Sequence, residues 1–185
     1  MIKLKYLFFL ALTFIVFENA QAQKMYIWCP NKLNPNPNTE QLKDIEINVL
    51  VKDSRLLTGK IKNKCTSEEL TNSVFYLIKE SYPNATVNQI TIKKNKTTNC
   101  KILIEIRITA YYATFTSSMW YAQTDFSVSI IDYRKEISNE YLQDIHKEKK
   151  FFNLGGSATA KNNLNKSFIE ANIELLDFLS DNLHE

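Results

Sequence analysis

The stretch from Lys101 to Thr109 alternates between apolar and polar side chains. Isoleucine occupies positions 102, 104, 106 and 108, and most of the residues between them are polar. A period of two with β-branched residues on one side is typical of a strand that is buried on one face. We therefore expect a central strand with a covered isoleucine face and a solvent-facing side that carries Lys101, Glu105 and Arg107.

Four further stretches have strand character, and two have the apolar spacing of a helix. Strands are predicted at residues 45–51, 87–93, 119–131 and 136–152, and the central strand extends to about residue 115. Thr66 and Glu69 form a capping box, which predicts a helix from Thr66 to Tyr82. The Gly155-Gly156 break precedes a second predicted helix, from Thr159 to Leu183.

Together these elements predict an α+β fold with two layers. A mostly antiparallel sheet of about four to five strands would carry two helices on one face, because the polar face of the central strand argues against a third layer. This single domain would span residues 45–185. Residues 23–44 are rich in Asn and Pro and predict an irregular leader.

Residues 1–22 have the composition of a secretory signal peptide. Lys3 and Lys5 precede a short apolar run, and Ala20-Gln21-Ala22 matches a small-x-small cleavage site. We expect cleavage before Gln23, a periplasmic or secreted protein, and no transmembrane segment after cleavage. An uncleaved anchor is the alternative.

Charge and composition narrow the classes of function. The formal net charge of +3 is too small to predict a nucleic-acid partner. The chain has two histidines, and no CxxC motif occurs, which argues against a zinc site. Because no catalytic or cofactor motif stands out, we expect a non-enzymatic protein without a cofactor.

Three cysteines, Cys29, Cys65 and Cys100, would meet an oxidising compartment after export, so one disulfide is expected. Cys65 precedes the first helix. If residues 87–93 run parallel to residues 45–51, a tight turn brings Cys100 to the same side of the sheet. This placement predicts the pair Cys65–Cys100, although Cys29 in its flexible leader could reach either partner.

Two groups of residues are candidates for contact with a partner. The first flanks the predicted hairpin turn and contains Tyr111, Tyr112, Phe115, Met119, Trp120 and Tyr121. Exposed aromatics at a hairpin tip would indicate a contact site, but strand alternation could equally bury half of them. The second group is Asp53 and Arg55 at a strand end, where pairing with each other is favoured over partner contact.

The order of elements resembles the small envelope lipoproteins of Gram-negative bacteria, of the YajG-type and LptE-like superfamily. Two patterns carry the resemblance: V-K-D-S-R ending at Arg55, with Gly59 soon after, and Gly155-Gly156 leading into the apolar face of the last helix. The lipidated cysteine of those proteins is missing here. The resemblance implies binding or assembly in the cell envelope, with an envelope or outer-membrane protein as partner.

A small secreted thiol-dependent enzyme is the alternative function. Such an enzyme needs an accessible cysteine with a histidine close to it. His146, in a charged predicted strand, is the candidate for that histidine.

Overall fold

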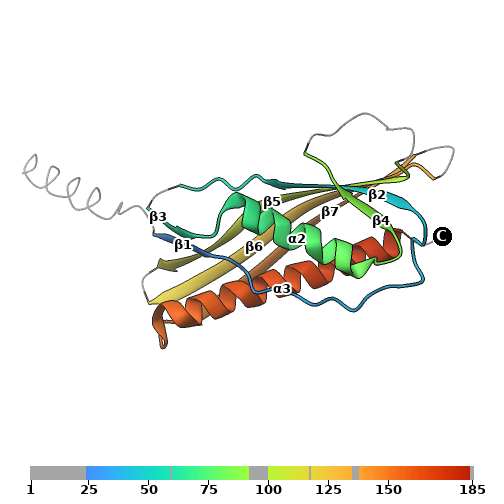
Figure 1. Ribbon diagram of the computed structural model, residues 1–185. Coiled ribbons are helices and arrows are strands. Elements are labelled where there is room, and N and C mark those ends of the chain that lie inside the picture. Colours follow the sequence, from blue (N-terminus) through green and yellow to red (C-terminus); the bar gives the residue numbers. More distant parts are fainter. Residues whose placement is uncertain (1–23, 59, 92–99, 117, 135–137, 184–185) are drawn as a thin grey trace, which may run out of the picture.

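The computed structural model describes residues 24–58, 60–91, 100–116, 118–134 and 138–183. The predicted signal peptide, Gly59 and the predicted turn at Asn95–Asn99 lie outside these residues. In chain order the elements are β1 (Met25–Trp28), β2 (Glu46–Asp53), β3 (Ile61–Lys64), α2 (Ser67–Ser81), β4 (Thr86–Gln89), β5 (Ile102–Thr116), β6 (Met119–Asp132), β7 (Asn139–Phe152) and α3 (Gly156–Asn182) (Figure 1).

Strand β5 is the centre of one seven-stranded sheet. One edge of β5 pairs antiparallel with β6, which pairs antiparallel with β7. The other edge pairs parallel with β2 and, further along, antiparallel with β1. The outer pairs β2–β4 and β1–β3 are both parallel. The α+β prediction is confirmed, but the sheet is mixed and larger than the predicted antiparallel sheet of about four to five strands.

A register shift between Ile108 and Ala110 divides β5 into two halves. Ile108 is opposite Asp53, the last residue of β2, whereas Ala113 beyond the shift is opposite Tyr26 of β1. Such a bulge bends a strand and increases its twist. The second half of β5 therefore receives a different neighbour, which the leader supplies.

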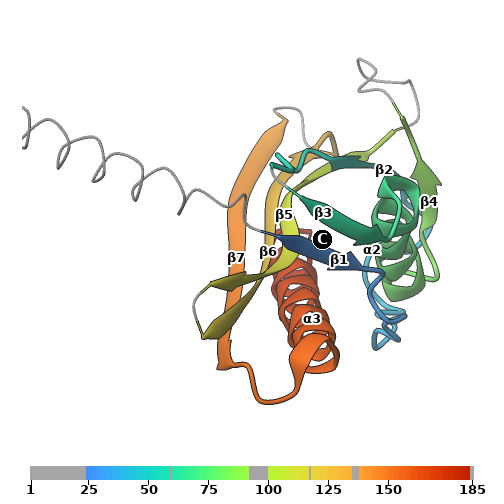
Figure 2. The ribbon, with the colours of Figure 1, turned by 90° about the vertical axis from the view of Figure 1, so that its left-hand side faces the viewer.

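The core lies between the concave side of the sheet and the two helices (Figure 2). The four isoleucines of the predicted alternation, at 102, 104, 106 and 108, are completely buried, as expected. Helix α2 packs on β2, and α3 packs across β5, β6 and β7. The helices meet this surface through apolar stripes that include Leu70, Val74 and Ile78 in α2 and Leu164, Phe168, Ala171 and Leu175 in α3.

The face of β5 that points away from the isoleucines is only partly as predicted. Lys101 and Arg107 are exposed, but Glu105 is buried, with 3% of its surface exposed. Lys52 Nζ lies 3.2 Å and Arg107 Nε 2.9 Å from Glu105 Oε1, so two cations compensate the buried carboxylate. The predicted solvent exposure of Glu105 was therefore wrong.

Both helix starts follow from local chemistry. The capping box at α2 is present: Glu69 N donates to Thr66 Oγ1, and Thr66 N donates to Glu69 Oε2. Helix α3 begins at Gly156, three residues before the predicted Thr159. Gly156 has a positive φ of 60°, a conformation that favours glycine. A Cβ on Gly155 would clash with the Thr159 side chain, so a larger residue there would require Thr159 to move.

Candidate functional site

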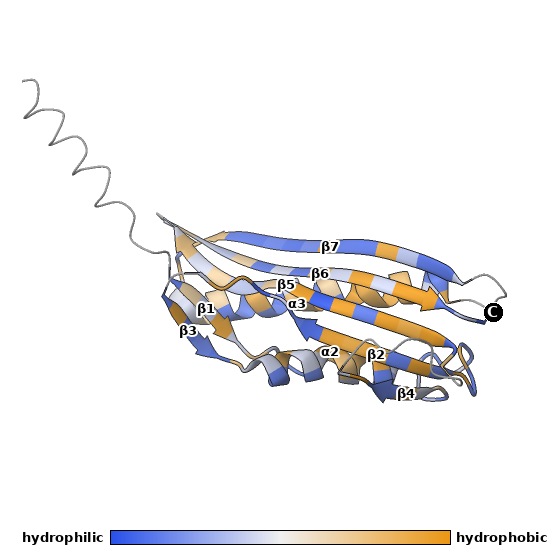
Figure 3. Ribbon diagram, turned by 90° about the horizontal axis from the view of Figure 1, so that it is seen from above, coloured by the Kyte–Doolittle hydropathy of each residue, from blue (hydrophilic) through white to orange (hydrophobic). Residues whose placement is uncertain are grey.

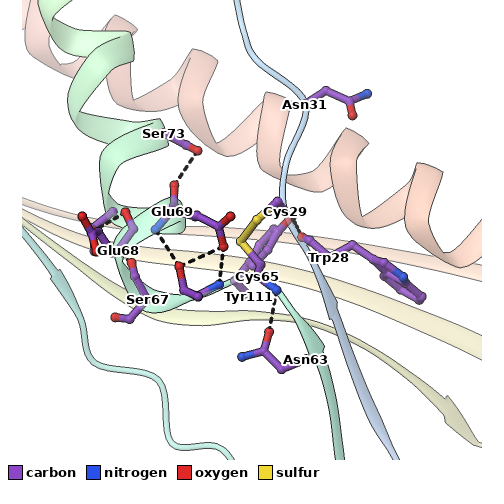
Figure 4. The surroundings of a disulfide bond; sticks show 12 residues. Trp28, Cys29, Asn31, Asn63, Cys65, Ser67, Glu68, Glu69, Ser73 and Tyr111 are labelled. Carbon is purple, nitrogen blue, oxygen red and sulfur yellow. Dashed lines mark hydrogen bonds between the residues drawn. A yellow bond between two sulfur atoms is a disulfide. The ribbon is translucent and has the colours of Figure 1, made fainter.

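A disulfide joins Cys29 to Cys65, with a Cα–Cα distance of 4.6 Å (Figure 4). Its geometry follows from the parallel pairing of β1 with β3, in which Trp28 is opposite Lys64. One residue further along each chain, the two cysteines are again neighbours. The bond fixes the leader to the residue that precedes the capping box of α2.

The predicted pair Cys65–Cys100 was wrong because the prediction assumed that β4 and β5 form a hairpin. Instead both strands run parallel to β2, one on each side of it. Cys100 therefore lies where β5 begins, beside the start of β2, whereas Cys65 lies far from that end. The Cys100 thiol is buried and donates to Ile102 O at 3.2 Å. Burial raises the pKa of this thiol.

Beside the disulfide, a groove of about 600 Å³ separates α2 from the segment that follows β1. Its walls are formed by Cys29, Pro30, Asn31, Lys32 and Leu33 on one side and by Glu69, Asn72, Ser73, Tyr76, Leu77 and Glu80 of α2 on the other. Phe168 of α3 completes the lining. A volume of this size is in the range of small-molecule and short-peptide sites.

Specific contacts hold the leader wall of this groove in place. At one end is the disulfide, and Asn31 N donates to Asn165 Oδ1 of α3 at 2.8 Å. Lys32 Nζ lies 2.9 Å from Glu80 Oε1 near the end of α2. Further along, Asn38 N donates to Ser81 O at 2.7 Å. The groove therefore has walls fixed at several points along its length.

The lining of the groove combines apolar surface with hydrogen-bonding groups. Tyr76 is 52% exposed although it is a large aromatic residue, and the buried residues Leu77 and Phe168 also line the groove. Asn72 contributes a side-chain amide whose Oδ1 accepts from Gln89 Nε2 at 3.2 Å. This composition suits a ligand with both an apolar group and polar edges. Tyr76 was not among the predicted contact residues, because the groove beside it forms only when the leader packs along α2.

Cys29, Cys65 and Glu69 are the one cluster of three metal-ligating residues found in the described part of the chain. The two sulfur atoms are bonded to each other, which removes the thiolates that a metal would need. Glu69 is engaged in the capping box, and hydrogen bonds from the backbone and then the side chain of Thr66 lower its pKa. In this oxidised form the three residues therefore hold the leader and the start of α2 together.

Asp53 and Arg55 form a buried ion pair. Arg55 Nε donates to Asp53 Oδ1 at 2.7 Å, and a second guanidinium nitrogen lies 2.6 Å from Asp53 Oδ2. The Arg55 side chain is 2% exposed and also donates to Tyr111 O. Burial alone would raise the pKa of Asp53, but hydrogen bonds from Arg55 and Ser67 outweigh it and lower the pKa.

The same spacing recurs at the end of β6, in Asp132 and Arg134. Arg134 N donates to Asp132 Oδ1 at 2.9 Å, and Arg134 Nε to the same oxygen at 3.0 Å. Arg134 Nε and a terminal guanidinium nitrogen also donate to Asp132 Oδ2, and the guanidinium donates to Leu183 O at the end of α3. In both Asp-x-Arg pairs the arginine joins a strand end to a distant carbonyl, and the shared spacing was a signal that could have identified Asp132.

The six predicted contact residues at the β5–β6 tip differ in burial, because neighbouring residues of a strand point to opposite faces of the sheet. Tyr111 and Trp120 are buried, Phe115 is 36% exposed, and Tyr112, Met119 and Tyr121 are half-buried. The Tyr111 hydroxyl donates to Trp28 O at 2.7 Å, and burial raises its pKa. The Trp120 ring contacts the rings of Tyr26 and Phe115, with centroid distances of 5.2 Å in each case. The tip thus closes the core over β1.

His146 lies on the sheet face opposite the helices. Its Nδ1 is 2.7 Å from Asp125 Oδ1, and Gln123 Nε2 donates to the other oxygen of Asp125 at 2.5 Å. Tyr112 donates to Gln123 Oε1 at 2.8 Å. This histidine is therefore part of a network of carboxylate and amide groups.

We expect the free energy of unfolding to fall when the pH drops below about 4. Asp53, Glu69 and Glu105 have pKa values below their ordinary values of 3.8, 4.5 and 4.5. A lowered pKa means that the ionised group stabilises the fold. That contribution is complete above the ordinary pKa and is lost as the pH falls through the folded value. Urea unfolding followed by circular dichroism between about pH 5 and 2 measures it.

The Glu105→Gln variant should lose less stability over this interval than the parent protein, because one of the three carboxylates is gone. A free energy of unfolding that stays constant down to about pH 2 would contradict the prediction.

In the described part of the chain, no helix is long and apolar enough to cross a membrane.

Comparison with known proteins gives distant structural matches only. No protein-family model matches the chain, and no curated protein matches its sequence. The hypothetical protein CT253 from Chlamydia trachomatis is 10% identical, with a TM-score of 0.48 over 74% of this chain and 95% of that chain. The lipoprotein GNA1162 from Neisseria meningitidis is 12% identical, with a TM-score of 0.41 over 72% of this chain and 98% of that chain.

Proposed function

We propose that the protein is a non-enzymatic exported binding protein and that the groove between α2 and the leader holds its ligand. The observation that carries this proposal is the groove itself, with a volume of about 600 Å³ and a half-exposed Tyr76 in its wall. A large aromatic side chain that stays accessible beside an apolar floor is a frequent anchor for ligands.

The disulfide supports the proposed location outside the cytoplasm. A bond between Cys29 and Cys65 is typical of a protein that works in the periplasm or outside the cell, because cytosolic thiols are kept reduced. The predicted signal peptide supports the same location. The resemblance to envelope lipoproteins adds a role in binding or assembly in the bacterial envelope, with an envelope or outer-membrane protein as the source of the ligand.

The shape of the groove favours a short extended peptide segment as ligand. Leu77 and Phe168 offer contact for one apolar side chain, and Tyr76 can cover it. The Asn72 amide and the Lys32–Glu80 pair lie along the walls, where a peptide backbone can exchange hydrogen bonds with them.

Two features weigh against the alternative of a thiol-dependent enzyme. Cys29 and Cys65 are bonded to each other, and the remaining thiol, Cys100, is buried with a raised pKa. A nucleophilic cysteine needs a lowered pKa and access to solvent. The second feature concerns His146, the predicted partner of a catalytic cysteine. Its ring contacts the carboxylates of Asp125 and Glu148 instead of a cysteine.

A displayed library of random heptapeptides tests the proposal. We expect peptides selected on the oxidised mature chain to share an apolar residue and to lose binding about tenfold or more in the Tyr76→Ala variant. Phe152→Ala is the matched control, because Phe152 is 65% exposed and lies on β7, outside the groove. Selected peptides that bind Tyr76→Ala as tightly as the parent protein would contradict the groove as the site.

A further inference from the structure

The outer edge of β7 is the longest free edge in the described part of the sheet. β7 has 14 residues and pairs only with β6, whereas the edge strands at the other ends, β3 and β4, have 4 residues each. In Figure 2 β7 closes one side of the molecule, with its outer edge uncovered by α3. A long unpaired edge is a template for another strand unless its side chains prevent pairing.

Charged side chains restrict which strand can bind this edge. β7 is largely hydrophilic along its length (Figure 3). The face away from the helices carries Glu140, Asp144, His146, Glu148 and Lys150, all exposed. The helix side carries Lys147 and Lys149, which form ion pairs with Glu174 and Glu170 of α3. A strand of arbitrary sequence would oppose some of these charges with like charges, which is unfavourable.

One candidate partner is β7 of a second copy of the protein, because the charges on both strands are then known from the sequence. Two copies can pair antiparallel about a two-fold axis perpendicular to the sheet, so that each face continues across the seam. Residues that lie directly opposite must then point to the same face. The register is defined by the residue that lies on the two-fold axis.

We propose that the protein forms a homodimer through antiparallel pairing of β7 with β7 of a second copy, centred on Ile145. In this register Glu140 of each copy lies opposite Lys150 of the other, and Asp144 lies opposite His146. On the helix side Ile145 meets its own copy, while Gln143 is opposite Lys147 and Tyr141 is opposite Lys149. Opposite charges face each other at two symmetric positions, and no like charges do.

The other registers that pair at least two thirds of the strand all place like charges in opposition. Centring on Asp144 brings two copies of Asp144 together. If His146 is on the axis, Asp144 faces Glu148. With Lys147 on the axis, two copies of Lys147 meet. Like charges directly opposite each other destabilise a strand pair, so the sequence selects the register centred on Ile145.

This dimer is independent of the ligand site. The groove is lined by the leader and α2, and Figure 2 shows α2 and β7 on opposite sides of the molecule. Pairing through β7 would therefore leave a groove accessible on each copy.

Charge reversal tests the dimer in the full mature chain with its disulfide intact. We expect sedimentation equilibrium to give a dimer, and the single variants Glu140→Lys and Lys150→Glu each to raise the dimer dissociation constant about tenfold or more. The double variant Glu140→Lys/Lys150→Glu restores the opposite charges and should return the dissociation constant to near that of the parent. Lys161→Glu, an exposed change on α3, is the matched control and should have no effect. A parent protein that stays monomeric, or single variants that dimerise as well as the parent, would overturn the proposal.

Disulfide crosslinking tests the register. Leu142 and Glu148 are opposite each other in the proposed dimer but are separated by roughly 20 Å within one strand, so the variant Leu142→Cys/Glu148→Cys can crosslink only between copies. We expect it to form a covalent dimer under mild oxidation, and Leu142→Cys/Lys150→Cys and Leu142→Cys/Phe152→Cys to form far less. More efficient crosslinking by either of these two variants would show another register and overturn the proposal.

Discussion

Replacing Cys29 and Cys65 by serine is expected to lower the free energy of unfolding by about 3 to 4 kcal/mol. The disulfide joins residues 36 positions apart, so its loss restores considerable freedom to the unfolded chain. In the folded protein the bond also fixes the leader wall of the groove to the start of α2. Guanidinium unfolding of the variant and the parent, followed by circular dichroism, measures the difference. Peptide binding in the groove should weaken in parallel.

Cys100→Ala provides the comparison, because it removes a cysteine without removing the bond. This variant should lose only the packing of one buried side chain, about 1 to 2 kcal/mol. Peptide mapping without reductant should give a crosslinked peptide that contains Cys29 and Cys65, and a Cys100 thiol that reacts with iodoacetamide only after unfolding. A Cys65–Cys100 peptide, or equal stability of parent and double-serine variant, would contradict the prediction.

Local patterns predicted the elements that local physics determines. The alternation around Ile104 identified the central strand, and the capping box at Thr66 identified the start of α2, because each signal lies within a few residues. The long hairpin of β5 and β6 was predicted for the same reason. The same reliance on local patterns explains why β1 was missed. It has only 4 residues and was predicted to be part of an irregular leader.

Long-range pairing could not be predicted in this way. The predicted disulfide assumed that a tight turn joins β4 to β5 as a hairpin. In the structure β2 lies between them, and this single difference moves Cys100 away from Cys65. The leader then supplies β1 as the partner of β3, which brings Cys29 to Cys65 instead. An error in strand order thus became an error in the disulfide.

The candidate site depended on the same long-range contacts. The groove exists because the leader returns along α2, so no pattern within α2 distinguishes Tyr76 from an ordinary exposed tyrosine. The hairpin aromatics were a more conspicuous signal, yet Tyr111 and Trp120 are buried where the tip closes over β1. Pairing of Asp53 with Arg55 was expected because surface charge pairs are common, but the small exposure of both side chains was not expected.

Removal of one partner of that pair is expected to have the other large effect on stability. Arg55→Ala should lower the free energy of unfolding by about 3 to 5 kcal/mol, because it leaves the Asp53 carboxylate without its main partner in a largely buried position. The Asp53 side chain is 12% exposed and that of Arg55 is 2% exposed. The variant also loses the hydrogen bond to Tyr111 O, which joins the end of β2 to β5 just beyond the bulge. Urea unfolding at neutral pH measures the loss.

Two further variants test whether the large effect arises because the pair is buried or would follow from the loss of any ion pair. Lys32→Ala removes an exposed pair, in which Lys32 is 72% and Glu80 39% exposed, and should cost about 0 to 1 kcal/mol. The double variant Asp53→Asn/Arg55→Met removes both charges and fills similar volume, so it should be more stable than Arg55→Ala. If Arg55→Ala costs no more than Lys32→Ala, the buried pair contributes little, and the stability of this strand end must come from the apolar packing around it.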